Sequence, residues 1–236
     1  MTRPTALEVS IAIGATTLQG LLRIPRDAPG IVLFAHGSGS GRLSPRNTYV
    51  AERLWDAGVA TLLFDLLTLQ EEEIDSVTAE LRFDIPLLTD RLAAATAWTR
   101  AHPQLQKLKV GYFGASTGAA AALAAAARIR EIGAVVSRGG RPDLAGPALS
   151  EVRAPTLLIV GGRDHEVLAL NRSALAKMSC EARLEIVPEA THLFMEPGAL
   201  ERVASLAAGW FHRHLSTALD GNPMREADRT VRGYHS

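Results

Sequence analysis

Apolar residues occur along the chain in short continuous runs, and these alternate with longer stretches in which apolar positions recur every three or four residues. Short runs such as Ile31–Ala35 are typical of strands buried on both faces of a parallel sheet. The longer stretches are typical of amphipathic helices that pack on such a sheet. The pattern therefore predicts an α/β fold, with a mostly parallel eight-stranded sheet and helices on both of its faces.

The predicted strands begin with a hairpin around a glycine-containing turn and continue as separate buried runs. They are Leu7–Ile13, Thr17–Arg23, Ile31–Ala35, Val59–Asp65, the run from Val110, Ala134–Ser137, Thr156–Val160 and Arg183–Val187. Helices are predicted over Pro45–Ala57, Asp84–His102, the alanine-rich stretch after Ser116, Glu166–Met178 and Pro197–Leu215, with a short polar helix or loop at Ile74–Glu80. Pro45 in the first turn supports the start of the first helix, and Pro103, directly after His102, supports the end of the second.

The 236 residues are enough for one domain with a large core. Residues 220–236 are polar and lack periodicity, so we expect an α/β domain over 1–219 and a C-terminal tail over 220–236. The segment between Ser137 and Thr156 is short and rich in Gly and Pro, which predicts a loop and no large cap domain.

The charge balance and the cysteine content limit the partners of the chain. The formal net charge is zero, so nothing favours nucleic acid or an anionic membrane as a partner. We find neither a signal peptide nor a membrane-spanning stretch. The single cysteine, Cys180, excludes an internal disulfide and fits a reducing cytoplasm. The sequence leaves the oligomeric state open.

Gly114-Ala115-Ser116-Thr117-Gly118 is the most informative motif, because it lies between a buried strand and an alanine-rich helix. Gly-x-Ser-x-Gly in this context is typical of a nucleophile elbow, which exposes the serine hydroxyl above the sheet. The backbone N–H of Thr117 would face the same space. Taken alone, the motif could be a glycine-rich turn with a serine facing solvent.

A serine nucleophile needs a general base and an acid that orients the base, in the chain order Ser, acid, His for elbow enzymes. Asp164 follows the strand Thr156–Val160, and His192 follows the strand Arg183–Val187. Asp164 could instead cap the next helix, or do both, and His192 could be a half-buried structural histidine. Asp143 and His165 are the nearest alternatives, but Asp143 lies in a Gly/Pro-rich loop and not directly after a strand, and His165, directly after Asp164, is expected to face solvent.

His36-Gly37-Ser38-Gly39 follows the central strand Ile31–Ala35 and predicts the second part of an oxyanion hole. The backbone N–H groups of Ser38 and Thr117 would then bind the developing negative charge. A phosphate-binding loop is the rival interpretation, and no Gly-Lys-Ser/Thr follows to support it.

These residues resemble the α/β-hydrolase fold, and within it the cap-less dienelactone-hydrolase-like serine hydrolases. The resemblance rests on His36-Gly37-Ser38-Gly39, Phe64-Asp65-Leu66, Gly114–Gly118, Gly161-Gly162-Arg163-Asp164 and Ala190-Thr191-His192. It implies catalytic roles for Ser116, Asp164 and His192. True dienelactone hydrolases use a cysteine nucleophile, and they hold a substrate carboxylate with arginines, one of them near the catalytic histidine. Here the nucleophile is Ser116 and that neighbourhood carries Glu196, so the dienelactone substrate does not carry over.

The sequence thus predicts a serine hydrolase that cleaves carboxylic esters of small soluble substrates and needs no metal or other cofactor. A thioesterase, lactonase or peptidase with the same triad stays open, as does a slow-turnover ligand-binding protein on this fold. His36, Gly37, Arg138 and Phe194 could line the pocket. Arg138 could bind an acidic substrate group, but we slightly favour a pairing with a nearby carboxylate that holds a loop.

Overall fold

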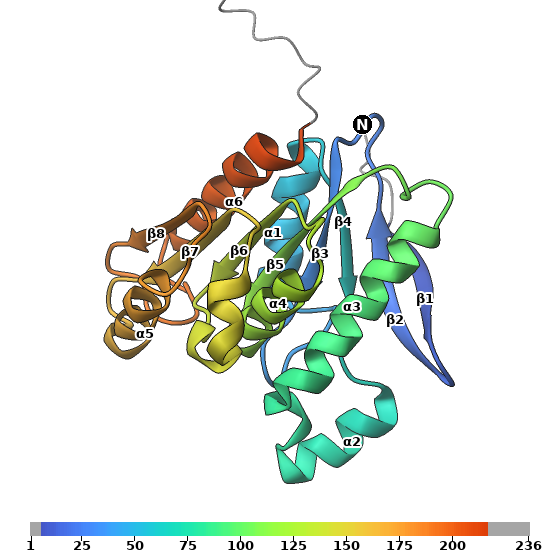
Figure 1. Cartoon of the computed structure of the whole chain (residues 1–236), viewed down its shortest axis with the longest axis horizontal. Helices are drawn as coiled ribbons and strands as arrows, with labels where there is room; N and C mark the ends of the chain where they lie inside the picture. The colour runs from blue at the N-terminus through green and yellow to red at the C-terminus, as the bar shows by residue number, and fades with distance from the viewer. Residues whose placement is uncertain (1–5, 217–236) are drawn as a thin grey trace, which may run out of the picture.

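The computed structural model describes residues 6–216, so the tail predicted for 220–236 lies outside the described residues. A single eight-stranded sheet, ordered β1-β2-β4-β3-β5-β6-β7-β8, forms the centre of the molecule. The hairpin β1–β2 is antiparallel, and β2 pairs antiparallel with β4. Every other pairing is parallel. The predicted α/β fold with its mostly parallel eight-stranded sheet is confirmed (Figure 1).

The strands match the apolar runs of the sequence closely. They are β1 (Leu7–Ile13), β2 (Thr16–Arg23), β3 (Gly30–Ala35), β4 (Ala60–Phe64), β5 (Lys109–Ala115), β6 (Ala134–Arg138), β7 (Thr156–Gly161) and β8 (Ala182–Val187). All residues of β3, β4, β6 and β7 are buried, because helices cover both faces of the sheet. Their carboxyl ends meet at one edge, where open α/β sheets bind ligands.

The helices are divided between the two faces of the sheet. α1 (Pro45–Asp56) and α6 (Ala199–Leu215) pack on one face, and α3 (Ile85–Ala101), α4 (Thr117–Arg128) and α5 (His165–Leu175) lie on the other, as Figure 1 shows. A separate hydrophobic cluster fills the space between each face of the sheet and the helices that cover it. Phe34, Phe113 and Phe211 belong to the cluster under α1 and α6, and Tyr112 and Leu123 to the cluster under α3 and α4.

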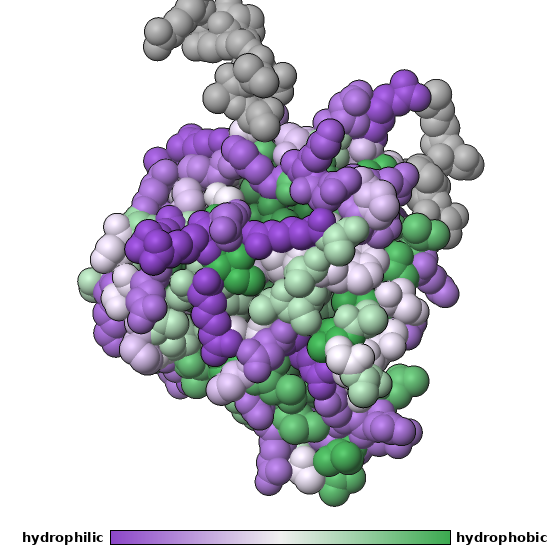
Figure 2. All heavy atoms as spheres, turned by 45° about the vertical axis from the view of Figure 1, so that its right-hand side comes forward, coloured by the Kyte–Doolittle hydropathy of each residue, from purple (hydrophilic) through white to green (hydrophobic). Residues whose placement is uncertain are grey.

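The segment after β4 differs from the prediction of a short polar helix or loop at Ile74–Glu80. It forms α2 (Leu69–Thr78) and the short 3-10 helix η1 (Leu81–Phe83). A capping box between Thr68 and Glu71 starts the helix five residues earlier than the hydrophobic pattern suggested. The helix projects from the body of the molecule (Figure 1) and leaves Ile74 and Val77 exposed. Figure 2 shows apolar surface at the lower end of the molecule, where α2 lies in Figure 1.

No cap domain covers the sheet edge within residues 6–216, as the sequence predicted. The segment between β6 and β7 forms only η2 (Pro142–Glu151), a 3-10 element with a kink at Gly146, whose φ is 55°. The segments that follow β4 and β6 thus contain only short helices.

Candidate active site

Ser116 occupies a strained turn between β5 and α4. Its φ of 50° and ψ of −120° place it in a region that serine rarely adopts, at a cost of about 1–3 kcal/mol. The glycines two residues before and after Ser116 make this turn possible. A Cβ at Gly114 would lie 2.4 Å from Ala119 Cα, and a Cβ at Gly118 would lie 2.2 Å from the Ala35 carbonyl oxygen. The local sequence is therefore built to hold Ser116 in this conformation.

Asp164 and His192 form a close pair at the same sheet edge. Asp164 follows β7, His192 follows β8, and His192 Nδ1 lies 2.7 Å from Asp164 Oδ2. Asp164 stands at the N-cap position of α5, yet its side chain makes no capping hydrogen bond. The carboxylate is thus directed to the imidazole instead of the helix, which leaves His192 Nε2 as the free ring nitrogen.

The two alternative residues have other environments. Asp143 accepts two hydrogen bonds from the guanidinium of Arg141, at 2.9 and 2.8 Å. His165 is the exposed first residue of α5. Neither contributes to the Asp164–His192 pair, so the structure separates the sequence candidates by their contacts.

Ser116 and His192 both lie beside the end of β6. The Ser116 N–H donates to the carbonyl of Arg138 at 3.3 Å. The next residue, Gly139, has a φ of 51°, and a Cβ there would lie 3.5 Å from His192 Cε1. The Ser116 hydroxyl makes no hydrogen bond with any residue in 6–216. Hydrogen bonds between a catalytic serine and its histidine are often long in ligand-free enzymes and shorten when substrate binds.

Two backbone N–H groups near Ser116 are free to bind an anion. Thr117 is the first residue of α4, where an amide has no acceptor inside the helix. Ser38 follows Gly37, and a Cβ at Gly37 would lie 3.1 Å from Ser116 Cβ. Neither N–H donates to another group within the described part of the chain. The loop of residues 36–41, which we call the oxyanion loop after its predicted role, thus packs directly against the elbow.

His36 holds this loop in a way that the sequence did not reveal. Its Nε2 accepts the Leu66 N–H at 2.9 Å, so its proton sits on Nδ1, which donates to the Gly37 carbonyl at 3.0 Å. Since C=O and N–H point in opposite directions across a trans peptide, this bond also fixes the direction of the Ser38 N–H. Burial lowers the pKa of His36 below 6.5, so the imidazole is neutral.

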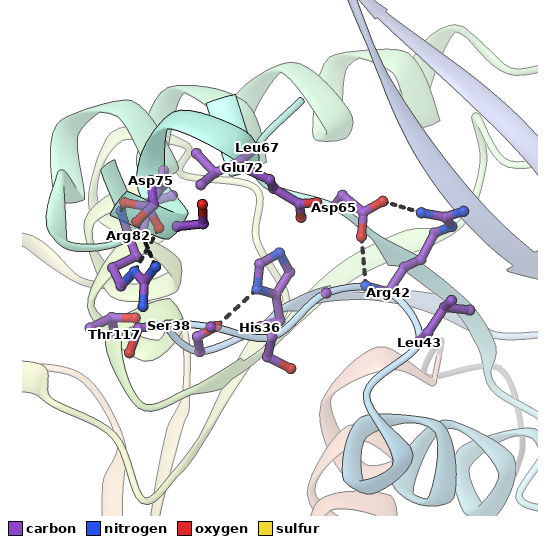
Figure 3. Close-up of a pocket in the computed structure, with 16 residues that line it drawn as sticks. His36, Ser38, Arg42, Leu43, Asp65, Leu67, Glu72, Asp75, Arg82 and Thr117 are labelled. Carbon is purple, nitrogen blue, oxygen red and sulfur yellow. Dashed lines mark hydrogen bonds and ion pairs between the residues drawn. The ribbon is translucent and has the colours of Figure 1, made fainter. Parts of the chain in front are cut away.

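A cleft of about 410 Å³ extends from Thr117 and the oxyanion loop to the underside of α2 (Figure 3). Two arginines line it, and each is held by a carboxylate: Arg42 pairs with Asp65, and Arg82 Nε lies 2.6 Å from Asp75 Oδ2. Burial opposes ionisation of Asp75, but hydrogen bonds from Arg82 outweigh it and lower the pKa of that carboxyl. Burial and the nearby Asp65 raise the pKa of Glu72.

The four residues expected to line the pocket fall into two groups. His36 and Gly37 line the cleft. Phe194 is only 2% exposed and packs in the hydrophobic cluster under α1 and α6, with a φ of 55°. Arg138 is also buried, and the favoured pairing with a carboxylate is wrong: it forms no ion pair with any residue in 6–216.

Metal-binding clusters and membrane-spanning helices are both missing from residues 6–216. This part of the chain contains no group of three or more His, Cys, Asp or Glu side chains arranged to hold a metal ion. Among its helices, none combines the length and apolar character needed to cross a membrane.

Comparison with known proteins gives a consistent picture of the fold. The sequence profile of the dienelactone hydrolase family matches residues 18–217. The crystal structure of a dienelactone hydrolase from Anabaena variabilis is 60% identical, with a TM-score of 0.88 over 90% of this chain and 99% of that one. A lidless α/β serine hydrolase from Xanthomonas campestris is 20% identical, with a TM-score of 0.72 over 94% of this chain and 99% of the other, and shows the fold alone.

A curated relative from Mycobacterium tuberculosis carries a different description. It is named a putative phosphoribosyl transferase and is 57% identical over 209 residues, which are 88% of this chain and 46% of the relative. The chain thus spans about half the length of this relative.

Proposed function

This chain belongs to the dienelactone hydrolase family, and from that premise we propose that it is a serine hydrolase that cleaves carboxylic esters of small, soluble substrates. A hydrolase activity follows from the family. The choice of ester bond and of Ser116, His192 and Asp164 as the catalytic triad is our proposal. The observation that carries it is the 2.7 Å contact between His192 and Asp164 at the sheet edge where the strained Ser116 lies.

In the proposed reaction, Ser116 Oγ attacks the ester carbonyl carbon while its proton passes to His192 Nε2. Asp164 keeps the other imidazole proton on Nδ1 and stabilises the imidazolium. The free N–H groups of Ser38 and Thr117 bind the tetrahedral oxyanion, and one such donor typically contributes about 3 kcal/mol to lowering the barrier. The intermediate then collapses, and the leaving alcohol takes the proton from His192.

The acyl group is then on Ser116, and water completes the cycle. His192 removes a proton from the water as it attacks the acyl carbonyl, and returns it to Ser116 Oγ when the acid leaves. The open cleft supplies both the water and the route for the acid. Phosphoribosyl transfer is not assigned to this chain, since more than half of the relative with that name lies outside the match.

Asp164→Asn and Asp143→Asn, a matched pair of isosteric changes, test the proposed triad. The amide introduced by Asp164→Asn would favour the wrong imidazole tautomer of His192, so kcat for 4-nitrophenyl acetate should fall by about 10⁴-fold. Asp143→Asn should change kcat little, because Asp143 contacts Arg141 and not His192. A crippling effect of Asp143→Asn with a silent Asp164→Asn would show that Asp143 is the acid of the triad and would overturn the assignment.

A panel of ester, thioester, lactone and anilide substrates tests the bond that is cleaved. We expect the highest kcat/KM for an ester. A higher value for a thioester, lactone or amide would reassign the substrate class while keeping the triad. One stoichiometric burst without steady turnover on any of them would favour the slow-turnover binding protein.

A further inference from the structure

Arg138 is a buried charge with no partner in residues 6–216. It is the last residue of β6 and is 8% exposed. Its guanidinium makes no hydrogen bond or ion pair with any of those residues, and Nη1 is completely shielded. Buried charges in native proteins are normally paired, since an unpaired one costs several kcal/mol. A group that the chain itself does not supply would satisfy this guanidinium.

Arg46 faces the same layer as Arg138, the hydrophobic layer between the sheet and the helices α1 and α6. Side chains alternate along β6, which places Arg138 on the side of Ala134 and Val136, under α1 and α6. Arg46 lies in the first turn of α1, four residues before Val50, which is fully buried against the sheet. Arg46 Nε is also shielded and unpartnered, and so is Asn47 Oδ1 beside it.

The two arginines repel each other. Burial, together with the charge of Arg46, lowers the pKa of Arg138 to about 10, so the Arg138 guanidinium remains charged at neutral pH. Four carboxylates of the loops at this sheet edge have other partners: Asp164 pairs with His192, Asp143 with Arg141 and Asp65 with Arg42, and Glu196 accepts hydrogen bonds from Thr191. Two like charges at the edge of the core therefore lack a neutralising anion among the described residues.

This layer adjoins the catalytic groups. The Arg138 carbonyl accepts the Ser116 N–H, and α1 begins directly after the oxyanion loop. The N-terminus of α1, beside Arg46, is the positive end of the helix dipole and also favours an anion there. Arg46 is only partly buried, so this layer borders solvent at its side chain.

We propose that Arg46 and Arg138 form a subsite for an oxyanion carried by the substrate, with a phosphate-type dianion preferred over a carboxylate. The proposal rests on the proposed esterase function and specifies its substrate class: an ester with an anionic group a few bonds from the scissile carbonyl. A dianion matches the two positive charges, and both guanidiniums can donate to its oxygens in a forked geometry.

Three 4-nitrophenyl esters of similar size form the kinetic test at pH 8. They are the neutral butyrate, the monoanionic hemiglutarate and the 3-phosphonopropanoate, which is largely dianionic. The wild type should show kcat/KM values rising in that order. Arg138→Met and Arg46→Met should each lower the ratio of kcat/KM for the phosphonate ester to that for the butyrate by about 10- to 100-fold, the usual effect of losing a charged hydrogen bond.

Arg141→Met is the matched control, because Arg141 is paired with Asp143. It should affect all three esters equally. Equal losses on neutral and anionic esters in Arg138→Met would overturn the subsite, and a hemiglutarate preference above the phosphonate would overturn the dianion assignment.

Thermal unfolding gives a readout that does not depend on hydrolysis. Removing an unpaired buried charge should leave the Tm of Arg138→Met equal to or above that of the wild type. Inorganic phosphate should raise the Tm of the wild type and of Ser116→Ala, but not that of Arg138→Met or Arg46→Met. This result without any ester turnover would keep the subsite and refute the esterase. Ester turnover without stabilisation by phosphate would refute the subsite alone.

Discussion

Replacing His36 by leucine tests how the oxyanion loop is held. The change keeps a side chain of similar volume and removes both hydrogen bonds of the imidazole, to the Leu66 N–H at 2.9 Å and to the Gly37 carbonyl at 3.0 Å. The Leu66 N–H is then left buried without an acceptor. A lost hydrogen bond of this kind costs about 1 kcal/mol and an orphaned buried donor about 1–3 kcal/mol. We therefore expect the free energy of unfolding to fall by about 2–4 kcal/mol.

The same substitution should impair catalysis through Ser38. With the Gly37 carbonyl released, the Ser38 N–H loses its fixed direction toward the oxyanion. Loss of one such donor sets an upper limit of about 3 kcal/mol on the effect, so kcat should fall by about 10- to 100-fold. KM should change little, because the donor acts on charge that develops in the transition state.

The stability loss should also depend on pH. The folded-state pKa of His36 lies below its ordinary value of 6.5, so the folded protein resists a proton that the unfolded chain accepts. The stability that His36 contributes is thus present above pH 6.5 and is lost as pH falls through the folded-state pKa. The difference between wild type and His36→Leu should be larger at about pH 8 than at about pH 5.

Urea unfolding at the two pH values and kinetics with 4-nitrophenyl acetate measure these effects. His212→Leu, at an exposed position of α6, is the matched control and should be close to wild type in both assays. A destabilised His36→Leu with normal kcat would refute the role of His36 in orienting Ser38. A stability difference that is the same at both pH values would refute the argument from its lowered pKa.

Two further predictions concern the cleft. Asp75→Asn should lower the free energy of unfolding at pH 7 by about 2–3 kcal/mol, because it leaves the Arg82 guanidinium without its buried partner. The pKa of Asp75 is lowered, so this contribution is present above pH 3.8 and is lost at lower pH; chemical unfolding that shows no gap at pH 7 would disprove the pairing. For 4-nitrophenyl esters of increasing acyl length, kcat/KM should fall beyond about eight carbons, since an open cleft does not bury the added methylenes, each worth about 0.8 kcal/mol when buried. A rate that climbs with chain length, or jumps when the substrate forms micelles, would reveal a hidden acyl tunnel.

Much of the fold could be predicted because its signals are local. Fully buried strands appear as continuous apolar runs, and the sheet topology follows from their alternation with helices. The elbow was readable as well, since only glycine tolerates the contacts at Gly114 and Gly118. Asp164 was preferred to Asp143 because it directly follows a strand, and the Asp164–His192 contact agrees with that preference.

The remaining features depend on contacts between distant parts of the chain. His36 and Leu66 are 30 residues apart, and no sequence pattern connects them. The missing partner of Arg138 became visible only once β6 and α1 were packed together. The start of α2, in contrast, has a local signal. Thr68 and Glu71 form a capping box that can be recognised in the sequence, but the acidic run Glu71-Glu72-Glu73 made the segment read as polar.

The central claim is that Ser116 is the nucleophile, and labelling with a fluorophosphonate tests it most directly. The serine oxygen displaces fluoride from phosphorus and keeps the phosphonyl group, so the label can be located by peptide mass spectrometry. We predict one label per chain, on Ser116, and no label on a Ser116→Ala variant that retains the wild-type circular dichroism spectrum. A label on Ser38 or Ser40 of the oxyanion loop, or an unlabelled wild-type protein, would contradict the account.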